Sequence, residues 1–263
     1  MLDHLIDSLA NSLPDLAILA FSAIVFGCVG GIIVFLSSRL WFRRWPQHSP
    51  FEDHLAEITH TSLLGFSAFV LALLISNGVS SLSKIQGVAI QEATSIYRLG
   101  RELDALGPAR RDAKQALAAY ARNVAEDEWP HLARLPNSLS PLAQQNLDDL
   151  WAGVRSAQRA MDSANPARSD LAGYVARIET LRGDRLSEAT SNIPSDFWLL
   201  LLLFVVDASF FVGRETPRRF GMQINWIQMS AIGLAVGLVI VLNNPFRGQT
   251  SVSPEIIGRA LSP

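Results

Sequence analysis

The feature that most constrains this chain is an uncharged apolar run at residues 61–77, which continues without a proline into a charged amphipathic segment ending near Leu106. The run is long enough for a helix to cross the hydrocarbon core of a bilayer. We therefore expect one long helix, or two helices joined near residues 78–83, with one half in lipid and the other in water. The other elements must pack beside one half or the other.

Three further apolar runs are long enough to span a membrane, at residues 16–36, 196–212 and 226–242. Charged sequence with few β-branched residues separates the second run from the third, which favours helices. The sequence predicts an all-α membrane protein with four transmembrane helices and a four-helix soluble bundle inserted between the second and third spans. The predicted parts are residues 1–82 (a short leader and two spans), 83–193 (the bundle) and 194–263 (two spans and a short tail).

The second helix of the bundle is expected to run from Pro108 to Glu128, because Trp129 and Pro130 should end it. A loop should follow at residues 131–140. The third helix is expected at about residues 141–163 and the fourth at about residues 169–191.

Arginines in the short loops predict the orientation of the chain. The loop after the first span carries Arg39, Arg43 and Arg44, and the loop between the last two spans carries three more, Arg214, Arg218 and Arg219. Short loops rich in arginine face the cytoplasm. The termini and the helical domain are therefore expected outside, and the location is expected to be the inner membrane of a bacterium.

Several function classes lack support in the sequence. The net charge is −2, so a basic nucleic-acid surface is not indicated. The chain has no phosphate-binding glycine loop, no HExxH, no paired-cysteine metal pattern and no GxSxG elbow. Its lone cysteine, Cys28, excludes an intrachain disulfide. We therefore expect no enzyme activity, cofactor, metal or nucleic-acid partner.

One face of the second span has polar ends and a bulky apolar middle. Offsets of three and four residues place Ser62, Phe66, Phe69, Leu73 and Ser76 on this face. Around an oligomer axis, the face would form a hydrophobic constriction between small polar rings, and such constrictions can gate ions by dewetting. Alternatively, the two phenylalanines fill contacts between helices.

Charged residues interrupt the apolar stripes of the soluble helices. Glu92 and Glu128 stand where apolar residues are expected, and Arg185 ends the stripe of the last soluble helix beside Arg182. The chain direction should bring these four residues, and Arg247 of the tail, to the membrane-proximal end of the bundle. An unpaired buried charge costs several kcal/mol, so pairing is expected. The cluster is either a structural ion-pair network or an ion site or gating element.

Asp207 lies inside the third span. An ionisable residue in a span is costly and is a functional candidate by default. It either forms a helix–helix hydrogen bond, protonated or paired, or serves a proton or cation relay.

Two spans carry small residues at a spacing that allows helices to approach closely. The first contains Gly27 and Gly31, and the fourth contains Gly233 and Gly237. This pattern predicts helix packing within one subunit or, alternatively, a subunit interface.

Several stretches, spread over nearly the whole chain, together resemble one known family. They are residues 63–77 (LLGFSAFVLALLISN), 92–98 (EATSIYR), Tyr120 with residues 126–130 (EDEWP), Arg182 with residues 185–186 (RL), and 244–248 (NPFRG) with 252–255 (VSPE). The chain is similar here to bacterial membrane proteins called bestrophin-like, and more distantly to true bestrophins.

The resemblance implies a homopentameric channel, usually selective for anions, with Phe66, Phe69 and Leu73 as neck positions. Lipid, further copies of the chain and permeating ions, expected to be anions, are then its partners. It also implies a cytosolic helical insert, whereas the arginines predict an external one. Two other hypotheses remain: a non-conducting membrane scaffold whose helical domain binds a partner or envelope component, and a proton-coupled device using Asp207.

Overall fold

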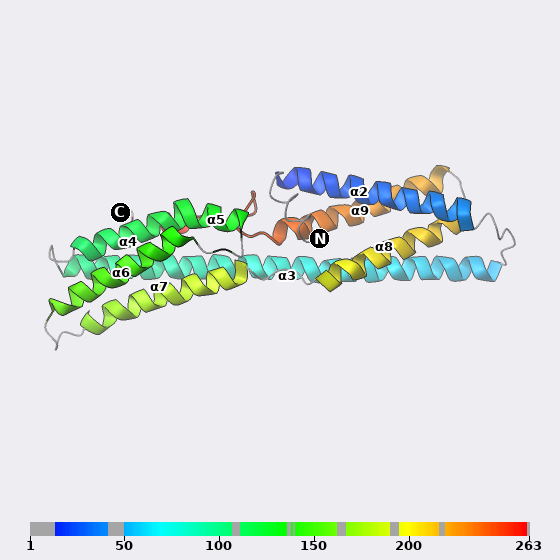
Figure 1. The fold of residues 1–263 in the computed structure, drawn as a ribbon. Helices are drawn as coiled ribbons and strands as arrows, with labels where there is room; N and C mark the ends of the chain where they lie inside the picture. The colour runs from blue at the N-terminus through cyan, green and yellow to red at the C-terminus, as the bar shows by residue number, and fades with distance from the viewer. Residues whose placement is uncertain are drawn as a thin grey trace. The chain divides into compact units, whose positions relative to one another are not determined.

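The computed structural model describes residues 14–41, 50–106, 111–135, 138, 140–161, 167–189, 195–215 and 219–261 (Figure 1). These residues contain helices and no strand, so the all-α class is confirmed for them. The α-helices are α2 (Asp15–Leu36), α3 (Pro50–Ala105), α4 (Arg111–Asn123), α5 (Trp129–Arg134), α6 (Pro141–Arg159), α7 (Ala167–Ala189), α8 (Ser195–Glu215), α9 (Arg219–Leu242) and α10 (Glu255–Gly258). Two segments are π-helical, η1 (Ser37–Trp41) and η4 (Val124–Glu128).

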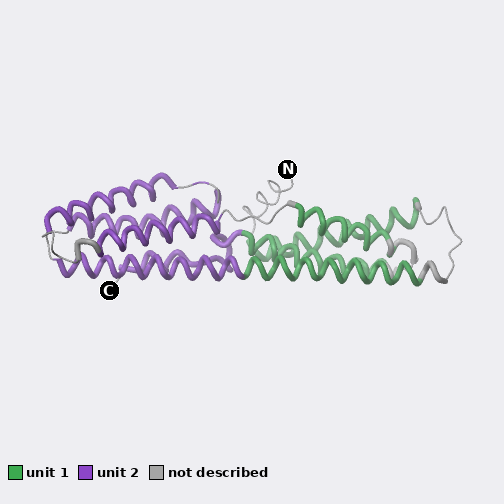
Figure 2. The backbone as a smooth tube through the Cα atoms, turned by 90° about the horizontal axis from the view of Figure 1, so that it is seen from below, with its two compact units in different colours: residues 1–79, 193–243 green, residues 80–192, 244–263 purple. Residues whose placement is uncertain are grey.

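The chain divides into two compact units. Unit 1 comprises residues 1–79 and 193–243, and unit 2 comprises residues 80–192 and 244–263 (Figure 2). The leader expected at the start of the chain lies outside the described residues. The tail, which the sequence groups with the last two spans, packs within unit 2.

Helix α3 has 56 residues and runs unbroken through residues 78–83, so the single-helix alternative is correct. The absence of proline after Pro50, the first residue, permits this length, because every backbone N–H after the first turn can donate within the helix. Gly78 has a packing role in the same stretch. A Cβ atom at Gly78 would lie 2.9 Å from Cβ of Leu242, so only glycine lets α9 approach α3 this closely.

Helices α2 and α9 of unit 1 pack against each other through glycines. A Cβ atom at Gly233 would lie 2.5 Å from the carbonyl oxygen of Ser22, and one at Gly27 would lie 2.5 Å from Oγ of Ser230. The prediction of packing within one subunit is thereby confirmed for Gly27, Gly233 and Gly237, but not for Gly31. On α2 the second contact glycine is Gly30, whereas a Cβ at Gly31 would meet no atom within 4 Å.

Three helical stretches among the described residues are long and apolar enough to cross a membrane. They are Asp15–Leu40, a window within His54–Ala105, and Met222–Leu242. The third predicted span coincides with α8, and the count of four spans stays a prediction.

Unit 2 is a helical bundle around one apolar core. Its core includes Ile96 of α3, Leu117 of α4, Leu150 of α6 and Ile178 of α7, all with no exposed surface. Helix α6 begins where Ser140 Oγ accepts a hydrogen bond from the Ala143 backbone N–H at 3.2 Å, as an N-cap does. It ends at Arg159, earlier than the predicted end near residue 163.

The second bundle helix differs from its prediction. Trp129 and Pro130 do not end it, because α4 passes through η4 into α5 and the helical path reaches Arg134. Residues 131–134, expected in a loop, are therefore helical. Pro130 stands in the first turn of α5, where a missing N–H costs least.

Candidate functional site

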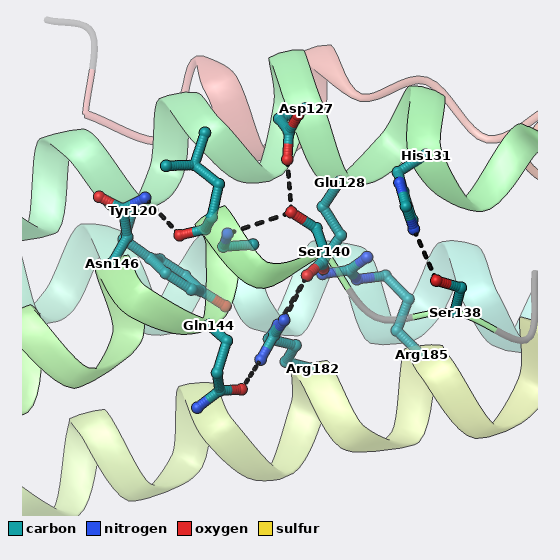
Figure 3. A network of polar contacts seen from close by, with 12 residues as sticks. Tyr120, Asp127, Glu128, His131, Ser138, Ser140, Gln144, Asn146, Arg182 and Arg185 are labelled. Atoms are coloured by element: carbon teal, nitrogen blue, oxygen red, sulfur yellow. Dashed lines mark hydrogen bonds and ion pairs between the residues drawn. The ribbon is translucent and has the colours of Figure 1, made fainter. Parts of the chain in front are cut away.

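Four charged side chains meet in the core of unit 2. Arg185 donates from Nε to Glu92 Oε2 at 3.0 Å and from Nη2 to Glu128 Oε1 at 2.6 Å. Arg182 donates to Glu128 Oε2 from Nε at 2.8 Å and from Nη2 at 2.5 Å. Glu92, Glu128 and Arg185 have no exposed surface, and Arg182 is 3% exposed. Figure 3 shows Glu128 between the two arginines.

Uncharged groups complete this buried network. The Tyr120 hydroxyl donates to Glu92 Oε1 at 2.7 Å, and Arg182 Nη1 donates to Gln144 Oε1 at 2.7 Å. The Arg185 guanidinium lies 4.8 Å from the centroid of the Trp129 ring, a cation–π distance. The network therefore joins α3, α4, η4, α5, α6 and α7 of unit 2.

Helical periodicity explains why these residues meet. Glu92 continues the buried stripe of α3 between Ala89 and Ile96. Arg182 and Arg185 are three residues apart on α7, so both side chains point to one side of that helix, after the buried Ile178. The charges thus occupy core positions, where only mutual pairing offsets their desolvation.

The pKa values follow from burial and charge. Burial opposes ionisation of Glu128, but the charges and hydrogen bonds of Arg185 and Arg182 outweigh it and hold its pKa below the usual value. Burial likewise opposes the charge on Arg185, yet Glu92 and Glu128 raise its pKa. Burial, together with the charge of Glu92, raises the pKa of Tyr120 well above the usual value. Glu128 and Arg185 are therefore charged, and Tyr120 neutral, at neutral pH.

Two carboxyl groups and two guanidiniums meet within ion-pair distance, so the geometry is that of a buried ion-pair network, and a role as an ion site or gating element stays a prediction. One donor remains, because Arg185 Nη1 is buried and has no hydrogen-bond partner among the described residues. Arg247, the fifth residue predicted here, lies half-buried in the tail, and its part in the cluster stays a prediction. The membrane-proximal position of the cluster also stays a prediction.

The tail of the chain docks next to this network. The Trp129 indole N–H donates to the carbonyl oxygen of Val252 at 2.9 Å, and its ring meets Phe246 edge-to-face at 5.2 Å. Asn244 Nδ2 donates to the carbonyl oxygen of Ala133 at 3.3 Å. Trp129 thus touches both Arg185 and the tail.

Polar contacts also fix the connection between α5 and α6. Ser140 Oγ donates to Asp127 Oδ2, and His131 Nε2 lies 3.0 Å from Ser138 Oγ (Figure 3). Sequence reasoning did not include Tyr120, Trp129 or Gln144 in the cluster. Tyr120 lies on the apolar stripe of α4 and Trp129 follows Glu128, which are usable signals, whereas nothing in the spacing marks Gln144.

The predicted neck residues lie along one exposed face of α3 in unit 1. Phe66 is 59% exposed, Phe69 61% and Leu73 50%, and Ser62 and Ser76 are also exposed. The opposite side of the same helix is buried, at Ser67, Val70, Leu71 and Leu74. Phe66 also stacks on Phe204 of α8, with ring centroids 6.1 Å apart. This large apolar face is therefore mostly uncovered within a single chain.

Asp207 is half-buried on α8. In the described part of the chain, its carboxylate has no recorded hydrogen bond or ion pair. On the next residue, the carbonyl oxygen of Ala208 lies 2.9 Å from Nδ1 of His60. Among the described residues, no group of three or more His, Cys, Asp or Glu side chains could hold a metal ion.

Comparisons with known proteins identify the fold. The family model described as "Bestrophin-like domain" matches residues 24–257. A crystal structure of a bacterial bestrophin homologue from Klebsiella pneumoniae, solved by zinc phasing, has a TM-score of 0.63 at 16% identity, covering 90% of this chain and 96% of that chain. A point mutant of such a homologue from the same organism has a TM-score of 0.62 at 15% identity, covering 90% of this chain and 95% of that chain. No curated protein matches the chain.

Proposed function

Because this chain belongs to the bestrophin-like family, whose known members are ion channels, we propose that it is itself the subunit of an ion channel. In this proposal five copies surround an axis, and the exposed face of α3 in unit 1 lines the narrowest part of the pore. Anions are the permeating species.

The observation that carries the proposal is the exposure of that α3 face. Phe66, Phe69 and Leu73 are each at least half exposed, although the other side of the helix is packed. A large apolar face of this kind is usually covered by lipid or by another subunit. If the same face of each subunit pointed toward a common axis, its side chains would form successive apolar rings, with the hydroxyls of Ser62 and Ser76 at the two ends. The face carries no carboxylate, which favours anions over cations.

The proposal also includes the predicted placement. Residues 1–82 and 194–263 contribute the membrane part, apart from the tail, which packs within unit 2. Residues 83–193 form a helical domain that the arginines place outside, whereas the resemblance implies a cytosolic one, and the protein sits in a bacterial inner membrane. The ion-pair network then holds the helical domain in one arrangement. A reporter enzyme fused at the C-terminus tests the orientation, and a cytoplasmic signal contradicts it.

The decisive experiment is flux from liposomes that contain the purified protein. The parent protein should release chloride above the rate of empty liposomes. Phe69→Ala should increase the rate several-fold, because a wider and less apolar ring lowers the dewetting barrier. The control is Phe21→Ala, which removes an exposed phenylalanine (45%, against 61% for Phe69) from α2 and should leave the rate unchanged.

Two outcomes contradict the channel. If no flux appears at any pH or voltage while the oligomer stays intact, a non-conducting scaffold is favoured. If Phe21→Ala changes the rate as much as Phe69→Ala, the α3 face does not line the path.

A proton-coupled device is the second candidate, and the half-buried Asp207 favours it. An ionisable residue inside a span is costly and is a functional candidate by default. Asp207→Asn keeps the size and removes the ionisable carboxyl group. It should abolish a proton-dependent flux while leaving assembly intact, and unchanged flux excludes this role.

A further inference from the structure

A pocket of about 530 Å³ lies between α3 and α7 inside unit 2, and none of its lining residues belongs to the buried ion-pair network. Its lining includes the cationic side chains of Arg98 and Arg177, together with Thr94 and Tyr174. A volume of this size is in the range of small-molecule sites and is far larger than one water or inorganic ion needs. The pocket belongs to neither the proposed pore face nor the charge cluster.

The two arginines differ in how they are held. Arg177 Nη2 donates to Gln91 Oε1 at 2.7 Å, and this bond fixes the Arg177 guanidinium against α3. Arg98 has no hydrogen-bond or ion-pair partner in the described part of the chain. Guanidinium groups bind phosphate and carboxylate oxygens through paired N–H donors. Two of them at one pocket favour an anionic ligand group.

The pocket also contains groups suited to an uncharged, hydroxyl-bearing body. Thr94 and Tyr174 supply hydroxyls, and Asp170, which already has an interaction of its own, supplies a carboxylate. Carboxylates and hydroxyls accept hydrogen bonds from ligand hydroxyls. This combination matches a phosphate attached to a hydroxylated carbon skeleton better than a bare inorganic anion.

Gly173 keeps the pocket open from the side of α7. Glycine within a helix is less stable than alanine, and a Cβ atom at Gly173 would meet no atom within 4 Å. Gly173 thus leaves space at this lining position, and a larger side chain there would fill part of the pocket.

We propose that the pocket between α3 and α7 binds a small phosphate ester with a hydroxylated body, with Arg98 and Arg177 holding the phosphate group. The same chemistry can come from a soluble sugar phosphate or from the glycerol-phosphate headgroup of a lipid. Neither source depends on conduction, so the proposal can fail or succeed independently of the channel.

Isothermal titration calorimetry on the full-length protein in neutral detergent tests the proposal with three soluble probes. Ribose 5-phosphate should bind saturably, more tightly than inorganic phosphate, and ribose should not bind. Arg98→Gln and Arg177→Gln should each weaken binding about tenfold or more, as expected for the loss of a charge-assisted contact. Short-chain phosphatidylglycerol is added as a competitor in a further titration. It should displace ribose 5-phosphate if the lipid headgroup is the natural source, and should not displace it if the soluble ester is the natural source.

Two matched controls separate a built site from general charge attraction. Gly173→Leu fills the pocket and should abolish binding, whereas Gly183→Leu is equally open and exposed on the same helix, lies outside the pocket, and should bind as the parent does. Arg101→Gln removes a nearby exposed cation outside the pocket and should have little effect. Absence of saturable binding overturns the proposal, as does equal weakening by Arg101→Gln and Arg98→Gln. Equal binding by Gly173→Leu and Gly183→Leu also overturns it. If Gly173→Leu fails to fold, the comparison of Arg98→Gln with Arg101→Gln decides.

Discussion

Replacing Arg185 by methionine should destabilise unit 2 more than any surface change. The guanidinium has no exposed surface and pairs with both Glu92 and Glu128. After the change Glu128 still has Arg182, but among the described residues Glu92 keeps only the hydroxyl of Tyr120 as a partner. Removing one partner of a buried ion pair costs about 3–5 kcal/mol, because a charge is left without compensation in the core. Methionine fills most of the arginine volume, so the loss is chiefly electrostatic.

Amide hydrogen exchange, measured by mass spectrometry on the full-length protein in detergent, gives this free energy directly. Buried amides of α6 and α7 exchange through large openings of the bundle, so their protection reports its stability. A loss of 3–5 kcal/mol lowers protection by a factor of roughly 100 to 5,000. The control Arg122→Met removes an exposed arginine of α4 and should change stability by at most about 0.5 kcal/mol.

A double variant tests the cause of the loss. In Arg185→Met combined with Glu92→Leu, the stranded carboxylate is gone as well. The double variant should therefore be more stable than the sum of the two single losses predicts, by about 1–3 kcal/mol. Two results refute the reasoning: protection in Arg185→Met within tenfold of the parent, or strictly additive losses in the double variant.

Three further predictions concern other contacts. Gly233→Ala places a methyl group against the backbone of α2 and should cost about 1–3 kcal/mol. Gly31→Ala meets no atom within 4 Å and should not destabilise the protein, because alanine favours the helix more than glycine does. Thermal melting in detergent would show both effects. Because the pKa of Glu128 is lower in the folded protein than its usual value of 4.5, its stabilising effect is complete above that value and is lost as the pH falls through the folded pKa. The free energy of unfolding should thus decline below about pH 4.5. A Glu128→Gln variant should be less stable at neutral pH, but its stability should decline less below about pH 4.5. Urea titrations at several pH values would reveal this difference. Trp129→Phe removes a buried indole donor and should speed proteolysis of the tail, whereas Trp151→Phe, which loses an exposed hydrogen bond, should not.

The sequence predicts the members of the ion-pair network better than its connections. Glu92, Glu128, Arg182 and Arg185 stand out because charges at core positions of an apolar stripe require partners. The stripes do not say which arginine pairs with which glutamate. That depends on the rotation of α7 against α3 and η4, which is set by packing of the whole core. Gln144 carries no such anomaly, so nothing distinguishes it from any solvated glutamine.

The packing of unit 1 shows the same limit. The small residues of the first and fourth spans predict a close approach, and the structure brings these two helices together. The spacing singles out Gly27 and Gly31, yet the second contact glycine is Gly30. Close helix packing selects residues by their rotation toward the partner, and the adjacent glycines Gly30 and Gly31 leave that rotation open.

The π-helical segment explains both the failed helix end and the composition of the network. A proline inside an α-helix removes one hydrogen bond and crowds the carbonyl group four residues earlier, so Pro130 should stop the helix. Here the Trp129 backbone N–H donates to the carbonyl oxygen of Val124, five residues back, and this wider turn immediately precedes the proline. The helical path then continues and buries Leu132. The same turn leaves the adjacent residues Glu128 and Trp129 both buried, and both reach Arg185, one as an ion pair and the other through its ring. A local irregularity without a spacing signal thus lets one arginine hold the glutamate network and contact the tryptophan that anchors the tail.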